Sequence, residues 1–283
     1  MTKLTIVNRA LALLGEYRVT TLTYADGVSG QEQATIQKVN DQYDGSRDIL
    51  LARYRWSFAR AQAILTPDWQ TMTTIADNGS GLVKITKVAH GLVTGDRVQN
   101  KDTARVDGPF FITRVDADNF TLDDSVYNSS ITLGSFVKAP LFGNEFQYEI
   151  PSDCLRVNSV NGRKAQASRS YWTQVGNFII VNTDSARITY TKRVTDETLF
   201  PDLFSSCLVK QLAADLAMPI LGATTSRQEL LQELENLDIP NARRANAIDK
   251  KQEVEQFSPS VEARLGGVID QRYPGIETNP LYD

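Results

Sequence analysis

The feature that most constrains the fold is a change in the spacing of apolar residues, from helical to alternating and back to helical. Residues 47–65 (RDILLARYRWSFARAQAIL) show mainly helical spacing and form the first piece of a motif whose second piece is residues 148–162 (YEIPSDCLRVNSVNG). About eighty residues between them are typical of short strands and turns. Because the chain leaves a helical region and later returns to one, the sequence predicts a β module inserted into a loop of a helical host.

Two helices are predicted at the start of the host. The first ends at Gly15, and its apolar residues recur at spacings of three and four: Leu4, Val7, Leu11 and Leu14. The second is a long helix from about residue 29 to Ala63, with a break near Gly45, and it cannot continue through Pro67. We therefore expect the segment before the insert to be helical almost to its end.

Further helices are predicted on the C-terminal side of the host. One is entered through Pro201 and carries an apolar stripe of Phe204, Leu208, Leu212, Leu216 and Ile220. The next has an apolar face of leucines and is predicted to end at Pro240. Residues 241–283 have helical propensity with few apolar anchors, followed by an end rich in Pro and Gly. Such a segment cannot bury a core of its own.

The insert and the segment after it are predicted to be β-rich. In the insert, β-branched or aromatic runs alternate with turn formers: VKITKV, FFITRV, NFTLDD and SITLGSFVKA. A second set of strands lies in residues 145–193, with tight turns at Asn161-Gly162 and Gly176-Asn177. The predicted fold class is α+β: a helical bundle with a small β part and an inserted all-β module resembling a barrel or sandwich.

This pattern predicts three domains. Residues 1–69 and 142–240 form the helical core with its small β part, residues 70–141 form the inserted β module, and residues 241–283 form a docking helix and an extended tail. Both ends of the insert must return to one place in the host, so the module is expected at the periphery.

Composition and motif content favour a non-enzymatic protein without cofactors. The chain has 283 residues, a net charge of −4 and 41% hydrophobic residues, and the acidic balance disfavours a protein that grips nucleic-acid phosphates. One histidine and two distant cysteines cannot supply a zinc site, and no P-loop, GxGxxG or GxSxG motif is present. His90 lies in a turn-like segment, where a structural role is favoured over catalysis. No signal peptide or membrane span is predicted, and the two cysteines are expected to be free thiols.

The densest cluster of arginine and aromatic residues is ARYRWSFAR, at residues 52–60. Arginine and aromatic side chains are enriched at protein interfaces, so a subunit interface is one interpretation. It would involve Arg53, Arg55, Trp56 and Arg60. The alternatives are that the rings cap the core while the arginines pair with acidic neighbours, or that rings and cations form a platform for nucleic acid.

Several stretches, taken in order, resemble one family. They are LALLGE (residues 11–16), RDILLARYRWSFARAQAIL (47–65), YEIPSDCLRV (148–157), ITYTKRVTD (188–196) and LFSSCLVKQLAADLAMPI (203–220). This series resembles the tail tubular protein A, or head-to-tail adaptor, proteins of short-tailed phages, and it covers roughly residues 3–65 and 145–240. The resemblance implies a helical bundle with a small β part that forms a dodecameric ring beneath the portal, through which the genome passes.

The insert has a likeness of its own. Residues 90–98 (HGLVTGDRV) and 106–124 (VDGPFFITRVDADNFTLDD) are similar to a small β module repeated in phage structural proteins. That module is also likened to the first catalytic-cysteine half-domain of ubiquitin-activating enzymes. The likeness implies a β fold and no enzyme activity.

The resulting expectation is a structural virion protein, an adaptor ring subunit that joins the portal to the tail nozzle and forms part of the DNA channel. Its expected partners are the portal protein, a nozzle protein similar to tail tubular protein B, eleven further copies of itself, and a tail fibre at the insert. Contact with genomic duplex DNA would be transient and non-specific, and no membrane is involved. The protein would reside in the host cytoplasm before assembly and then in the phage neck.

The C-terminal tail is the predicted portal-docking element, through spaced anchors: Val261, Leu265, Ile269, Tyr273, Ile276, Leu281 and Tyr282. Such a segment can wrap a partner that offers pockets. Two other functions remain open at this point. One is a virion-associated glycosidase that cuts cell wall, and the other is a receptor-binding or fibre-attachment module.

Overall fold

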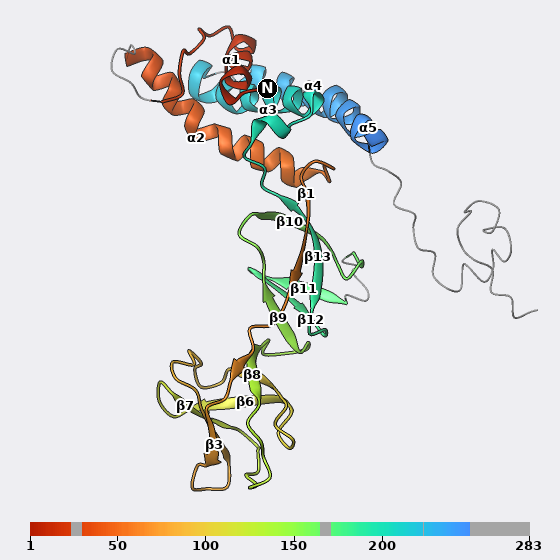
Figure 1. The fold of residues 1–283 in the computed structure, drawn as a ribbon. Helices are drawn as coiled ribbons and strands as arrows, with labels where there is room; N and C mark the ends of the chain where they lie inside the picture. Colours follow the sequence, from red (N-terminus) through yellow and green to blue (C-terminus); the bar gives the residue numbers. More distant parts are fainter. Residues whose placement is uncertain (24–29, 165–170, 223, 250–283) are drawn as a thin grey trace, which may run out of the picture.

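The computed structural model describes residues 1–23, 30–164, 171–222 and 224–249. The chain forms three tiers along one elongated axis, with helices at one end, two small sheets in the middle and a larger sheet at the other end (Figure 1). Helices account for 35% of the residues and strands for 27%, so the chain is an α+β protein.

The helical tier is assembled from the two ends of the described chain. It contains α1 (Lys3–Leu13), α2 (Gly30–Arg53), a short 3-10 helix η1 (Glu197–Leu199), α3 (Asp202–Leu221), α4 (Thr224–Glu233), a π-helical turn η2 (Leu234–Asp238) and α5 (Ile239–Asp249). The first predicted helix is confirmed. It ends at Leu13, and Gly15 follows the C-cap residue Leu14 with a φ of +75°, a conformation that favours glycine.

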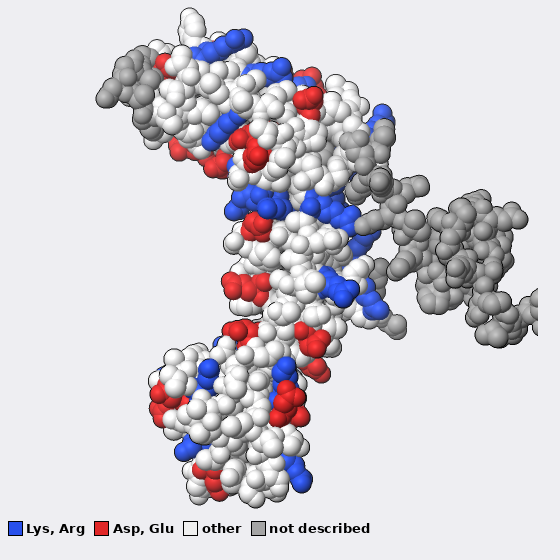
Figure 2. Space-filling view, viewed as in Figure 1, with Lys and Arg blue, Asp and Glu red and all other residues white. Residues whose placement is uncertain are grey.

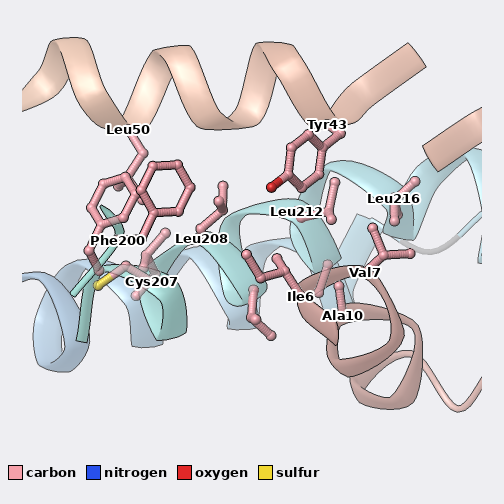
Figure 3. Close-up of a cluster of buried hydrophobic side chains, with 14 of the residues drawn as sticks. Ile6, Val7, Ala10, Tyr43, Leu50, Phe200, Cys207, Leu208, Leu212 and Leu216 are labelled. Atoms are coloured by element: carbon pink, nitrogen blue, oxygen red, sulfur yellow. The ribbon is translucent and has the colours of Figure 1, made fainter. Parts of the chain in front are cut away.

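The centre of this tier is α3, whose predicted stripe is buried. In Figure 3, Tyr43 and Leu50 point from α2 toward Leu208 and Leu212 of α3, while α1 packs on the other side through Ile6, Val7 and Ala10. Among the described helices, α3 alone has the length and composition of a membrane span, and 61% of that window is buried within the subunit. Its central position in the core accounts for this apolar composition.

The prediction for the second helix is wrong in two respects. First, α2 runs without a break through Gly45. Second, it ends at Arg53 and not near Ala63, and residues 60–65 form strand β1 (Arg60–Leu65). The apolar residues of this strand alternate, and their side chains face the core of the middle tier: Ala61, Ala63 and Leu65.

The middle tier contains two antiparallel three-stranded sheets. One has the order β1-β13-β10, with β13 at Ala186–Lys192 and β10 at Cys154–Val160. The other has the order β11-β12-β9, with β11 at Trp172–Val175, β12 at Phe178–Val181 and β9 at Phe146–Glu149. Apart from β1, these strands fall within the predicted second β-rich stretch. The sheets share one apolar core, which includes Phe146, Tyr148, Trp172, Ile179, Ile188 and Tyr190.

All strands of the lower tier lie in the predicted insert, between residues 70 and 139. The single antiparallel sheet has the order β2-β8-β5-β6-β7-β4-β3. Its strands are β2 (Gln70–Thr71), β3 (Thr74–Asp77), β4 (Val83–Thr86), β5 (Arg97–Lys101), β6 (Gly108–Arg114), β7 (Asn119–Leu122) and β8 (Ser135–Ala139).

This sheet curls around its own core of buried side chains, among them Ile85, Ile112, Phe120 and Phe136. The curl brings its two edges together. The Met72 amide donates to the Gly134 carbonyl near β8, and the Thr73 amide donates to the Thr86 carbonyl of β4. The module is therefore one curled sheet and not a sandwich. Its folding as an independent domain stays a prediction.

At the C-terminal side, Pro240 does not end the helix, contrary to the prediction. It is the second residue of α5, which directly follows the π-helical turn η2, in which the Ile239 amide donates to the Leu234 carbonyl. Such a local π turn is a recognised adjustment within an α-helix, and the chain stays helical through Pro240. Ala242 is buried against the helical core, so the start of the predicted docking segment packs on this tier. The predicted docking residues lie outside the described residues: Val261, Leu265, Ile269, Tyr273, Ile276, Leu281 and Tyr282.

Candidate functional site

The most distinctive surface of the described chain is a groove at the junction of the helical and middle tiers. Three adjoining pockets of about 330, 170 and 680 Å³ form it. The first two share Arg55 and Trp56, and the last two share Arg60 and Lys164. We call this surface the basic groove, after the cationic residues that line it: Arg53, Arg55, Arg60, Arg156, Lys164, Arg187 and Arg243.

The charged residues that line this groove, within the described ranges, are all basic. Its other lining residues, within the described ranges, are polar or apolar, and no aspartate or glutamate is among them. The chain as a whole carries a net charge of −4. Figure 2 shows Lys and Arg gathered at the waist below the helices, while acidic side chains lie mostly above and below it. Basic side chains are therefore concentrated on one surface of a protein whose net charge is negative.

The floor of the basic groove is the outward face of the sheet β1-β13-β10. Strand alternation sends the alanines of β1 into the core and leaves Arg60 on the opposite face. Pairing then sets Arg60 opposite Thr191, which lies opposite Arg156 on the other side. Two further cross-strand rows follow along the strands: Gln62, Thr189 and Ser159, then Ile64 and Arg187. The face thus presents cations beside hydroxyl and amide groups.

The upper wall of the groove is the C-terminal end of α2 and the turn after it. The Trp56 indole Nε1 donates to the Leu50 carbonyl at 2.9 Å, and Arg156 Nη1 donates to the Ala52 carbonyl at 3.5 Å. Both donors satisfy carbonyls that the helix end leaves without an intrahelical partner. A cation is also favoured there by the helix dipole. The sheet and the helix are therefore joined through a residue of the groove.

Helix α5 closes the same wall through one asparagine. Asn246 Oδ1 accepts from both the amide and the hydroxyl of Ser57 at 2.7 Å, and its Nδ2 donates to the Arg55 carbonyl at 3.3 Å. These bonds fix the turn after α2 against a helix nearly two hundred residues later in the chain, with a separation of 189 for the Ser57 pair. The groove is consequently a preformed surface.

An aromatic ring lies close to two of the arginines. The Arg243 and Arg53 guanidinium carbons lie 5.0 and 5.9 Å from the centre of the Tyr54 ring. Contacts of this kind contribute about 0.5–1 kcal/mol at exposed sites. Arg53 also forms an ion pair with Glu235, which is not among the residues that line the three pockets. Tyr54 thus helps to orient the upper arginines of the groove.

All four residues predicted for a subunit interface line the basic groove: Arg53, Arg55, Trp56 and Arg60. Trp56, however, contributes little surface to it. Trp56 is only 2% exposed and packs edge-on against Phe204, with ring centres 5.1 Å apart. Its indole ring belongs to the helical core, so it offers almost no surface to another subunit. This burial agrees with the alternative that the rings of ARYRWSFAR cap the core.

Four cations of the groove were missed by the sequence reasoning: Arg156, Lys164, Arg187 and Arg243. Alternation in residues 186–192 (ARITYTK) gives a signal for Arg187, because it puts Arg187 on the outward face opposite to the buried Ile188. No local sequence pattern indicates that these four cations lie together, because they come from three distant stretches of the chain.

The side chains of His90 and Asp116 stabilise local structure in the insert. His90 Nδ1 accepts from the Leu92 amide at 3.0 Å, and its ring packs edge-on against Phe120. The Asp116 carboxylate accepts from the Asp118 and Asn119 amides, and these hydrogen bonds lower its pKa. The described residues contain no group of three or more His, Cys, Asp or Glu side chains arranged to hold a metal.

Comparison with known proteins finds no matching protein family and no matching curated relative. The chemistry of the groove is therefore inferred from its own residues. A preformed cationic surface with hydroxyl and amide donors, and without a nucleophile and general base in contact, is suited to binding an extended anion.

Proposed function

We propose that this chain is a ring-forming head-to-tail adaptor subunit of a short-tailed phage, joining the portal to the tail nozzle. The observation that carries the proposal is the convergence of the stretches that resemble this family. Side chains from all five pack on one core, although they are spread over two hundred residues: Leu11, Leu50, Leu155, Val194 and Phe204. Stretches that meet in this way belong to the core of one body and are not scattered surface features.

The finer fold is part of this proposal. The helices of residues 1–69 and 142–240, with the two small sheets, would correspond to the helical bundle and small β part of the family. The curled sheet of residues 70–139 would be the added β module. In Figure 1 this sheet lies at the end of the molecule remote from the helices. That position suits a peripheral module that braces another tail component, such as a fibre.

The proposed assembly is a ring of twelve copies. In a closed ring each subunit uses two different lateral surfaces, so a rigid wedge-shaped body is required. Hydrogen bonds between distant segments, such as Ser46 to Asp215 at 2.6 Å, support such rigidity in the helical tier. The portal and a nozzle protein would be the axial partners, and residues beyond 256 would dock on the portal.

The test is to image the neck of particles that contain this protein and to measure the rotational symmetry of its layer. Twelvefold symmetry directly beneath the portal is expected. Another symmetry would overturn the assignment, and detection only at distal tips would favour a receptor-binding or fibre module. Sustained hydrolysis of peptidoglycan by the purified protein, abolished by a single Asp or Glu substitution, would favour a glycosidase. Truncation after Gln256 should preserve the fold but abolish binding to portal rings.

A further inference from the structure

We propose that the basic groove binds the sugar-phosphate backbone of duplex DNA through Arg55, Arg60, Lys164 and Arg187. The inference rests on the proposed function for its choice of DNA, and it deepens that function by assigning the contact to a defined face of the subunit. Net charge had argued against a grip on phosphates, but net charge averages over surfaces that the fold separates.

The set of side chains in the groove matches the chemistry of a phosphodiester backbone. Phosphate oxygens in DNA complexes accept hydrogen bonds from Arg and Lys and also from Ser, Thr, Asn and Gln. The groove offers both kinds of donor, because its cations surround uncharged polar residues: Gln62, Asn158, Ser159 and Thr189. An arginine fork can bind two phosphate oxygens at once.

The cations of the groove floor are spread over an extended face. Along the strands, the pair of Ile64 and Arg187 lies two outward-facing rows beyond the pair of Arg60 and Thr191. Across the sheet, Arg60 and Arg156 flank Thr191 from the two neighbouring strands. Cations are thus arrayed in two directions over the face, which favours a continuous charged strand over a single small ion.

Duplex DNA fits better than a single strand. Binding of single strands relies on exposed aromatic rings for base stacking, whereas Trp56 is 2% exposed and Tyr54 is only partly exposed, with two arginines near its ring. The centre of the groove floor is polar, with Thr189, Ser159 and Gln62, and Ile64 adds an exposed apolar side chain beside it. Competition by an acidic polypeptide therefore has to distinguish the two kinds of anion.

The test measures binding of a fluorescent 30-base-pair duplex to the full chain by anisotropy across a salt series. The groove variant combines Arg55→Gln, Lys164→Gln and Arg187→Gln, all at exposed positions. A matched control combines Arg9→Gln, Arg18→Gln and Arg105→Gln, which are also exposed and remove the same charge. Circular dichroism melting of each variant verifies that the fold is retained.

The groove variant should bind the duplex on the order of 100-fold more weakly at 0.1 M salt, because each lost phosphate contact removes about 0.9 from the slope of log K against log salt. Three lost contacts should reduce the magnitude of that slope by about 2.7, whereas the control variant should change it little. Equal weakening in both variants, or wild-type binding by the groove variant, would overturn the proposal. So would tighter binding of a single strand, or equal competition by polyglutamate of the same charge.

These outcomes are separable from those of the proposed function. Twelvefold symmetry in the particle with no groove-dependent DNA binding would remove the inference and leave the adaptor assignment. Groove-dependent binding with a different symmetry would do the reverse.

Discussion

The contacts that stabilise the helical tier and those that stabilise the insert sheet differ greatly in sequence separation. In the helical tier, Ser46 bonds to Asp215 and Tyr43 to Glu197, at sequence separations of 169 and 154. In the insert, every strand of the sheet lies between residues 70 and 139. A region built from local segments can form without the rest of the chain, whereas the helical tier forms only when both ends of the chain meet. The two regions should therefore unfold separately.

The largest expected effect is from truncating the centre of the helical core. Phe204 is 1% exposed and packs against three aromatic rings: Trp56, Phe58 and Phe200. Phe204→Ala should lower the free energy of unfolding of the helical tier by about 3–5 kcal/mol, through lost burial and a residual cavity. Urea denaturation followed by far-ultraviolet circular dichroism measures the helical transition.

The reciprocal variant tests the comparison from the other side. Phe120 is fully buried in the insert core and packs edge-on against Phe136, with ring centres 5.1 Å apart. Phe120→Ala should destabilise the insert by a similar amount, about 3–5 kcal/mol, and leave the helical transition unchanged. If either variant shifts both transitions equally, the two regions form one cooperative unit and the comparison is wrong.

Deleting the insert should cost the host less than Phe204→Ala. Joining Gln70 to Ala139 through a short Gly/Ser linker removes residues 71–138, including Val137, which is packed in the middle-tier core. The expected loss is about 1.5–3 kcal/mol, the value for burial of one valine side chain. Calorimetry should still show cooperative unfolding of the host. The full-length Val137→Ala variant is the matched control, and collapse of cooperativity in the deletion alone would assign other insert residues to the main core.

A glycine in the insert should have a smaller effect, confined to that sheet. A Cβ added at Gly134 would lie 2.2 Å from the Lys101 carbonyl oxygen, a backbone atom that cannot move aside without shifting β5. Gly134→Ala should therefore cost the insert about 1–3 kcal/mol through overpacking. Gly45→Ala is the control, because its Cβ meets nothing within 4 Å, and in mid-helix it should be neutral or slightly stabilising. Hydrogen exchange of the β5 and β8 amides measures the local change.

The different sequence separations of the contacts in these two regions also explain which features could be predicted from the sequence. Strands in the insert and the stripe of α3 follow from local periodicity, and both predictions were right in type and approximate position. The strand β1 was missed because RAQAIL reads equally well at helical and alternating spacing, since alanine is common in helices. Its pairing with β13, more than a hundred residues later, decides the outcome.

The basic groove was out of reach of sequence reasoning for the same physical reason. Arg55, Arg187 and Arg243 come from separate stretches, and only the tertiary fold brings them to one face. A net charge of −4 gives no information about such segregation. The run ARYRWSFAR contributes three arginines to the groove, although Trp56 in the same run is almost entirely buried. Composition thus predicts average properties, while a binding surface depends on placement.

The smallest expected effect concerns the two thiols, one in each of the upper tiers. Burial raises the pKa of the Cys154 thiol to about 11 and that of the Cys207 thiol to about 12. The reactive species is the thiolate, so both should react slowly with iodoacetamide at pH 8. Cys154 should react first, because it is partly accessible and Cys207 is fully buried. Mass spectrometry of samples quenched over time, with a urea-unfolded control, measures both rates.

The same thiols should give a weak alkaline dependence of stability. The unfolded chain loses each thiol proton near its usual pKa, whereas the folded chain holds it until pH 11 or 12. Between these limits the unfolded state binds fewer protons, so the free energy of unfolding falls as pH rises above about 9. Cys207→Ala should remove the larger part of the total loss, because the pKa of Cys207 is raised further and only this thiol still contributes between pH 11 and 12. An unchanged slope in that variant would mean that other groups, such as the buried tyrosines, dominate the alkaline transition.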